Sequence, residues 1–176
     1  VLPERWSGPL VPVGEEEIVL VVPFDDPPAG RPSVGLHELA DRPWVRCAME
    51  PVVDGRPFLD GVCGAAGFEP RTAVWTEHTS TAIRMAAAGV GISTAPSHTV
   101  RGVLGEDCGV LSVDPPWLRA LAVFSRVALT GAAAAFTELI TALPDTGIRP
   151  LRPFRPGDPS PERAYADCAG PPAVVR

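Results

Sequence analysis

Short continuous apolar runs, bounded by proline, glycine and acidic residues, are the first pattern along this chain. Residues 18–22 (IVLVV) are β-branched or leucine throughout, and Pro23 closes the run. A run of this kind predicts a strand that is buried on both faces, as parallel strands covered by helices are. Residues 121–125 (LAVFS) predict a second strand of the same buried type.

Residues 72–96 (TAVWTEHTSTAIRMAAAGVGISTAP) combine two strand patterns with a helical one between them. Residues 72–76 and 92–95 are the strand segments, and the intervening apolar residues recur at the spacing of one helical face. Gly89 can end the helix in a left-handed conformation, and Gly91 allows the next strand to pass close beneath. We predict a βαβ unit whose two strands are parallel neighbours, with the helix over residues 80–88 on one face.

Hydroxyl and imidazole side chains gather at the corner between the first of these strands and the helix. They are Thr76, His78, Thr79, Ser80 and Thr81. The corner falls at the carboxyl edge of the predicted sheet, where α/β proteins bind small ligands, and a helix N-terminus offers free N–H groups to an anion. The corner is therefore a candidate site for a carboxylate or another polar anion. Alternatively, Thr79 and Ser80 only cap the helix.

The remaining patterns predict shorter elements on either side of this unit. They are a helix over residues 36–40, a strand over 43–47, a loop over 49–55, a helix over 58–66 and a strand over 109–113. A last helix has its apolar residues spaced as one face packed on a sheet; these are Ala132, Phe136, Leu139, Ile140 and Leu143. Residues 148–176 are rich in Pro, Arg, Asp and Gly without a period, which predicts a disordered tail.

Composition narrows the classes of partner. The apolar content of 45% is sufficient for one domain or two small lobes. The formal net charge is −6, and no basic run occurs, so the chain lacks the electrostatic footprint of a nucleic-acid-binding domain. The predicted ligand is small or proteinaceous. No apolar run approaches the roughly 20 residues that span a bilayer, and the expected compartment is the cytoplasm.

The chemistry-bearing residues do not form a recognisable catalytic or metal-binding motif. The cysteines show no C-x-x-C pair and no zinc-like spacing to a histidine; they are Cys47, Cys63, Cys108 and Cys168. Asp25 and Asp26 stand before two prolines and are interpreted as a solvated turn. His78 and His98 have no partner in a nucleophile or triad motif. We expect neither a metal nor a cofactor, and no enzymatic activity.

Taken in order, several segments resemble the effector-binding domain of LysR-type transcriptional regulators. The resemblance covers residues 9–143 and rests on the segments GEEEIVLVVPFDDPPA, LHELADRPWVRC, AAGFEPR, TEHTSTAIRMAAAGVGISTAP and DPPWLRALAVFSR. The AAAGVGIS stretch is the most specific of these in its context. The same elements at plausible spacing, rather than any single motif, carry the resemblance.

The resemblance implies an α/β fold of the periplasmic-binding-protein-like (type 2) class with two lobes. Residues 1–32 would be a partial first lobe and hinge, residues 33–117 the second lobe, and residues 118–147 the return to the first lobe. The family's N-terminal winged helix-turn-helix has no counterpart in this sequence, so we expect an N-terminally incomplete regulator. DNA contact and homo-oligomerisation would then belong to the intact parent protein.

The family's function would be to bind a small polar metabolite in an interlobe cleft and so control the DNA-bound oligomer. Carried over by position, the effector-binding residues are Thr76, His78, Thr79, Ser80, Phe24 in the hinge and Met49 in the following loop. A solute-binding protein of a transport system would share the fold and the cleft. The sequence upstream of Val1 distinguishes the two: a helix-turn-helix favours the regulator and a secretion signal favours the transporter.

The sequence also predicts how this chain behaves alone. The resemblance places the partners of strands 18–22 and 121–125 before Val1, so part of their apolar surface would be exposed. A few hundred Å² at roughly 25 cal/mol per Å² is several kcal/mol, comparable with the stability of a small domain. The isolated chain should associate, as measured by light scattering, and should show no specific promoter binding in a gel shift. A stable monomer would contradict the first expectation, and sequence-specific binding the second.

Overall fold

The computed structural model describes residues 8–53, 55–104 and 108–142. The chain divides into two compact units, one of residues Glu17–Trp117 and one that combines Val1–Glu16 with Leu118–Arg176. The larger unit contains most of the predicted elements and the candidate site. The predicted disordered tail, residues 148–176, lies outside the described residues.

The larger unit is built on a mixed sheet. Its principal strands are β1 (Leu10–Val22), β2 (Ser33–Gly35), β3 (Pro43–Cys47), β6 (Arg71–Thr76), β7 (Ser93–Pro96) and β8 (Gly109–Asp114). Four of them follow the order β2-β8-β1-β7, and β3 pairs with β6 in parallel. A parallel bridge between Trp44 and Ile92 joins the two groups. It is closed by two backbone hydrogen bonds, Val45 N–H to Ile92 O and Ile92 N–H to Pro43 O, each 2.8 Å.

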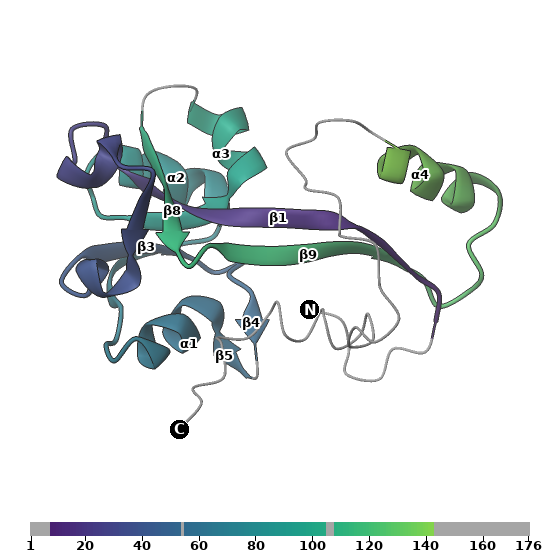
Figure 1. Ribbon diagram of the computed structural model, residues 1–176, viewed down its shortest axis with the longest axis horizontal. Helices are drawn as coiled ribbons and strands as arrows, with labels where there is room; N and C mark the ends of the chain where they lie inside the picture. The colour runs from purple at the N-terminus through teal and green to yellow at the C-terminus, as the bar shows by residue number, and fades with distance from the viewer. Residues whose placement is uncertain (1–7, 54, 105–107, 143–176) are drawn as a thin grey trace. The chain divides into compact units, whose positions relative to one another are not determined.

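Helices cover both faces of this sheet. The helices are α1 (Phe58–Ala65), α2 (Thr79–Ala87) and α3 (Ser97–Leu104), and shorter elements are two 3-10 turns, Pro27–Gly30 and Leu36–Leu39, and the hairpin strands β4 (Val52–Val53) and β5 (Arg56–Pro57). Figure 1 shows α1 on one side of the strands and α2 with α3 on the other. The result is a three-layer α/β unit with a separate apolar cluster on each face of the sheet.

Strand β1 confirms the predicted burial on both faces for residues 19–22, whereas Ile18 is half-buried. Leu20 and Val22 pack in the cluster with α1, while Val19 and Val21 pack in the cluster with α2 and α3. The strand is nevertheless antiparallel to both its neighbours in this unit, β7 and β8. This pairing places residues 18–22 in the same unit as residues 33–117, whereas we expected them beside the partial first lobe. It also covers the apolar surface of residues 19–22, part of which we expected to be exposed; in the second of the two strands, Phe124 is 52% exposed.

The predicted βαβ unit is present with one correction. Strands β6 and β7 and helix α2 form where the sequence places them, and Gly89 has a φ of 85° as its predicted helix-ending role requires. The two strands are not neighbours, because β3 lies between them through its ladder with β6 and its bridge to Ile92. A helix about 10 Å wide covers two strand spacings of about 4.8 Å, so α2 can cross over an intervening strand.

The smaller unit pairs the first half of β1 with β9 (Trp117–Phe124), and α4 (Gly131–Ala142) follows. Glu16, whose exposed fraction is 1%, accepts hydrogen bonds from the Arg119 guanidinium at 2.6 and 2.7 Å. Strand β9 contains the predicted residues 121–124 but is only partly buried before Phe124.

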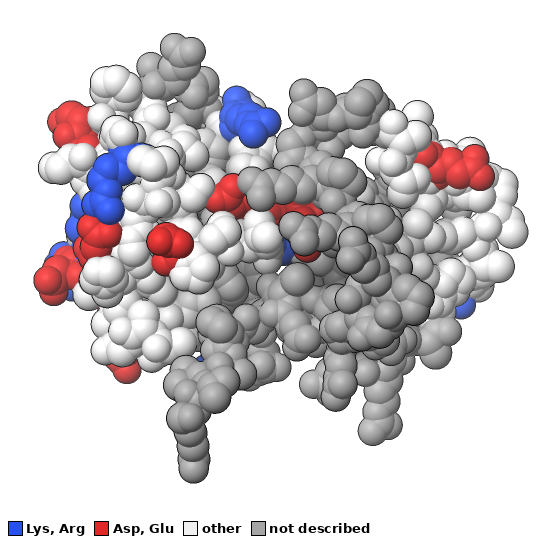
Figure 2. Space-filling view, in the orientation of Figure 1, with Lys and Arg blue, Asp and Glu red and all other residues white. Residues whose placement is uncertain are grey.

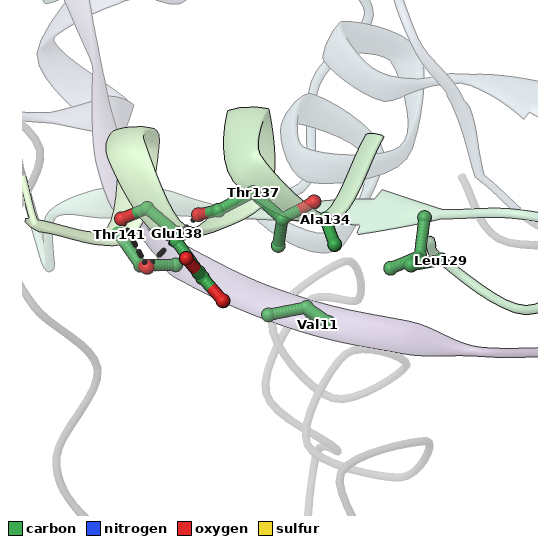
Figure 3. Close-up of a pocket in the computed structure, with 6 residues that line it drawn as sticks. All are labelled: Val11, Leu129, Ala134, Thr137, Glu138 and Thr141. Atoms are coloured by element: carbon green, nitrogen blue, oxygen red, sulfur yellow. Dashed lines mark hydrogen bonds between the residues drawn. The ribbon is translucent and has the colours of Figure 1, made fainter. Parts of the chain in front are cut away.

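The predicted apolar face of the last helix is wrong. Phe136 and Leu139 are 57% and 60% exposed, whereas Thr137 is buried. Ala134, Thr137 and Thr141 line a pocket of about 280 Å³ together with Val11 of β1. Figure 3 shows these side chains around it. Thr137 is therefore the covered residue of this helix, with Ala134 half-buried beside it, whereas two of the bulky residues face outward. Leu143 of the predicted face lies outside the described residues.

The close approach at Gly91 gives a test of the β3–β7 junction. A Cβ atom at Gly91 would lie 2.5 Å from the carbonyl oxygen of Pro43, which is rigid backbone. We expect Gly91→Ala to lower the free energy of unfolding by about 1–3 kcal/mol in urea titrations, the usual range for overpacking. Gly61→Ala in α1 is the matched control, because a Cβ there meets nothing within 4 Å. That variant should gain up to about 1 kcal/mol; equal effects in both variants would refute the steric argument.

Candidate effector-binding site

The site lies at the carboxyl edge of the parallel strands β3 and β6. Because the two strands run in the same direction, the loop after β3 and the start of α2 emerge at the same edge of the sheet. Thr76 is the last residue of β6 and Thr79 is the first of α2. Met49 stands in the loop after β3 with an exposed fraction of 75%. Five of the six predicted site residues are therefore found at this edge.

The sulfur atom of Cys47 joins the two sides of this edge. Its Sγ lies 3.4 Å from the Met49 backbone nitrogen, which donates to it, and 3.6 Å from the Thr79 hydroxyl. The thiol also lies 3.6 Å from the carbonyl oxygen of Glu77 and can donate to it. Cys47 itself is buried. The Cys47 side chain therefore contacts both the loop that carries Met49 and the first turn of α2, and it holds these two segments close together.

The polar side chains of the corner differ in their exposure and in whether they already make hydrogen bonds within the protein. The Thr76 hydroxyl lies 3.3 Å from the Arg46 carbonyl and 3.1 Å from the His78 carbonyl, so its proton is used within the protein. Thr79 is half-buried beside Cys47, whereas His78 and Ser80 are exposed. A ligand at the corner would therefore find His78 and Ser80 accessible first.

The N-terminus of α2 is not capped by a side chain. The N-cap is His78 with extended φ and ψ of −122° and 137°, and it makes no side-chain cap hydrogen bond. Its carbonyl accepts from the amides of Thr81 and Ala82, both at 3.1 Å. Thr79 and Ser80 are thus the first two helical residues and do not cap the helix, which corrects the alternative interpretation of these residues. Their N–H groups stand at the positive end of the helix dipole.

Phe24 does not belong with the other predicted site residues. Because β1 is antiparallel to β7, with Val21 opposite Ser93, its carboxyl end lies at the amino ends of the parallel strands. An ion pair between Asp26 and Arg42, which just precedes β3, confirms this position. Phe24 is 73% exposed at that edge. The direction of β1, which the sequence does not reveal, is the reason for this correction.

A buried ionic cluster lies beside the corner and was not predicted from the sequence. Arg46 of β3, 5% exposed, contacts Glu50 at 2.8 Å and Asp60 at 2.6 Å, and its Cζ lies 4.4 Å from the ring centroid of Trp75. Glu50 also accepts the backbone N–H of Leu59 in the first turn of α1. The cluster therefore fixes the loop after β3 and the start of α1. The available signal was the arginine inside an apolar strand with a glutamate four residues later.

Burial and charged neighbours shift the pKa values of Arg46 and Cys63. Burial opposes the charged form of Arg46, but hydrogen bonds to Asp60 and Glu50 outweigh it and raise the pKa of the guanidinium. Burial, followed by the charge of Asp60, raises the pKa of the Cys63 thiol to about 12. Cys63 is therefore protonated at neutral pH and a poor nucleophile. Within the described residues no group of three His, Cys, Asp or Glu side chains is arranged to hold a metal ion.

The chain, whose larger unit has helices on both faces of a mixed sheet, shares the type 2 periplasmic-binding-protein-like fold. In open α/β sheets small molecules bind at the carboxyl ends of the strands. The model of the LysR substrate binding domain matches residues 1–144. The chain belongs to this family of LysR effector-binding domains, as its sequence segments suggest. The family match favours the regulator over the transport protein of similar fold.

Solved structures agree on the fold. The C-terminal domain of a probable LysR family transcriptional regulator from Rhodococcus sp. RHA1 is 26% identical, with a TM-score of 0.60, over 81% of this chain and 70% of that one. The regulatory domain of CcmR from Synechocystis PCC6803, in complex with 2-PG, is 17% identical with a TM-score of 0.63, over 81% and 69% of the two chains.

The effector-binding domain of QuiR in complex with shikimate is 21% identical, with a TM-score of 0.57, over 76% of this chain. This chain spans 63% of the length of that domain. No curated protein matches the sequence significantly. Among the described residues no helix is long and apolar enough to cross a membrane.

The buried cluster generates a stability prediction. Replacing Arg46 by Met removes the cation from Glu50, whose side chain is 9% exposed, and leaves that carboxylate buried without it. Breaking one partner of a buried pair typically costs about 3–5 kcal/mol. Urea unfolding of Arg46→Met should show a loss in this range, while Arg84→Met on the exposed side of α2 should change stability by less than about 0.5 kcal/mol. A loss below about 1 kcal/mol for Arg46→Met would show that the cluster does not stabilise the fold.

Proposed function

We propose that this chain is the effector-binding part of a LysR-type regulator and that residues 17–117 bind a small polar anion at the corner of Thr76, His78, Thr79 and Ser80. The observation that carries the proposal is the N-terminus of α2, which no side chain caps and which His78 and Ser80 flank in exposed positions. The role is binding, with no turnover of the ligand.

Each group at the corner has a different part in this proposal. The amides of Thr79 and Ser80 would donate to an oxygen of the anion, and the Ser80 hydroxyl and His78 ring would complete the contact. The helix N-terminus carries about +0.5 of an elementary charge, and hydrogen bonds to a charged group contribute about 1.5–3 kcal/mol each. Met49, which contacts the same sulfur as Thr79, would border the ligand on its other side.

Regulation would follow from differential affinity. An effector shifts a conformational equilibrium only as far as it binds one state more tightly than the other. In the intact regulator this shift would reach a DNA-bound oligomer in the cytoplasm through the winged helix-turn-helix of the family. The charge distribution supports the assignment of effector binding to this chain and of DNA contact to the winged helix-turn-helix. Figure 2 shows acidic and basic side chains scattered over the described part of this face, with no broad basic area. DNA contact is therefore assigned to other parts of the parent protein.

Substitutions at the corner test the proposal. A panel of small carboxylates and phosphates, beginning with shikimate and 2-PG, is screened by thermal shift against the 176-residue chain. For any ligand that stabilises it, Ser80→Ala and His78→Ala should each weaken binding by about 0.5–2 kcal/mol in calorimetry, or about two- to thirtyfold, because each removes a side chain that would contact the ligand. The control is Thr72→Ala, which removes a half-buried hydroxyl at the other end of β6.

The outcomes separate binding from folding. Unchanged affinity in both corner variants would move the site away from α2, and an equal loss in the Thr72 control would indicate a general effect on the strand. Binding that is insensitive to the charge of the ligand, for example equal affinity for an acid and its amide, would contradict the role of the helix N-terminus.

A further inference from the structure

Glu17, the first residue of the larger unit, carries a buried side-chain oxygen that has no hydrogen-bond partner. Within the residues that the structure describes, its Oε1 is covered and meets no donor. The preceding residue differs, because Glu16 accepts from the Arg119 guanidinium at 2.6 and 2.7 Å. An unpaired buried acceptor is destabilising, so such a group in a folded protein requires an explanation. One explanation is a ligand that supplies the donor.

Strand pairing places Glu17 at the same edge of the sheet as the corner. Ile18 is opposite Pro96, the last residue of β7, so Glu17 lies just beyond the carboxyl end of that strand. Strand β7 runs parallel to β3, because the bridge between Trp44 and Ile92 is parallel. The carboxyl ends of β3, β6 and β7 therefore lie at one edge, where ligands bind in sheets of this kind, and Glu17 lies at that edge too.

Glu17 also lies on the face of the sheet that α2 covers. Side chains alternate along a strand, so Glu17 shares its face with Val19, which packs in the cluster with α2 and α3. Cys47, which contacts Thr79 in the first turn of α2, lies on this face as well, since it packs with Ala82 of that helix. The Glu17 carboxyl and the first turn of α2 are thus on the same face and at the same edge.

The strand registers set the scale of the distance between Glu17 and the corner. Counted from the parallel bridge between β3 and β7, Cys47 is level with Ala95, which is opposite Val19. Cys47 and Val19 are thus two strand spacings apart, about 10 Å, and Glu17 lies beyond Val19 toward the edge. A small molecule about as long as this spacing can therefore contact the first turn of α2 at one end and the Glu17 carboxyl at the other.

We infer that Glu17 is a second contact of the effector and that the effector is an amino acid, with its anionic group at the first turn of α2 and its ammonium group at the Glu17 carboxyl. An ammonium group supplies both a donor for Oε1 and the opposite charge, whereas a neutral donor would leave the charge of the carboxylate uncompensated. This assignment rests on the proposed anion site at α2 and narrows its ligand to one chemical class.

Acids matched with and without an amino group test the Glu17 contact. The pairs are glycine with acetate, γ-aminobutyrate with butyrate and ε-aminocaproate with caproate, and each Kd is measured by NMR titration of the full 176-residue chain. At least one of the two longer amino acids should bind at least about tenfold more tightly than its plain acid, whereas glycine is too short to reach both groups and should show no such advantage.

Two isosteric variants assign this advantage to a residue. Glu17→Gln removes the charge and should abolish the advantage, while the Kd of the plain acids stays within about twofold, which also shows that the variant is folded. Glu69→Gln makes the same change at an exposed position before β6, at the opposite edge of the sheet, and should keep the advantage.

Plain acids and amino acids report on different parts of this arrangement. Ser80→Ala should weaken both kinds of acid alike, because both use the first turn of α2. Amino acids that bind no better than plain acids at any length would overturn the Glu17 contact and leave the anion site standing. So would an advantage that survives in Glu17→Gln or is lost equally in Glu69→Gln. Failure of every acid to bind, plain or amino, would overturn both the contact and the anion site.

Discussion

Strand β3 is the part of the fold on which the other features depend. Two backbone hydrogen bonds from Pro43 and Val45 to Ile92 attach it to the strands around β1, and its ladder with β6 attaches the outer strand. Without this central position, β6 would have no place in the sheet and the corner before α2 would have no neighbouring loop. The close approach requires glycine at position 91, because a Cβ there would meet the Pro43 carbonyl.

The same strand carries a buried charged residue, Arg46, which contacts three other elements of the site region. Arg46 reaches Glu50 in the following loop, Asp60 in α1 and Trp75 in β6. Burying a guanidinium is costly unless several partners share its charge, and here two carboxylates and an aromatic face do so. The cluster thereby fixes the loop that holds Met49, the start of α1 and the exposed indole of the edge strand.

Two surfaces with different chemistry consequently meet on β6. Its carboxyl end leads into the uncapped N-terminus of α2, where an anion would be stabilised by amides and the helix dipole. Its middle carries the exposed Trp75, whose ring the Arg46 guanidinium contacts. Thr76 links the corner to the strand. Its hydroxyl contacts the Arg46 and His78 carbonyls at the corner, and Thr76 is itself the last residue of β6.

Local sequence determined the elements of this protein, because their patterns depend on neighbours in the chain. The buried run at residues 18–22, the strand–helix–strand order of residues 72–96, the left-handed Gly89 and the corner at Thr76–Ser80 were all readable in this way. The ordered set of segments was enough to predict the family that the match over residues 1–144 confirms. The helix cap was not predicted correctly, since Ser, Thr and His at a helix start permit several cap positions.

Tertiary structure alone decided how these elements were joined, because strand order and direction depend on contacts between distant residues. The insertion of β3 between β6 and β7 separated two strands that the sequence suggested as neighbours. The antiparallel course of β1 moved Phe24 to the opposite edge from the candidate site. In α4 a threonine, Thr137, is buried while Phe136 and Leu139 are exposed. The Arg46 cluster required side chains up to 29 residues apart, from Arg46 to Trp75, to meet in space. None of these long-range contacts produces a periodic pattern in the sequence.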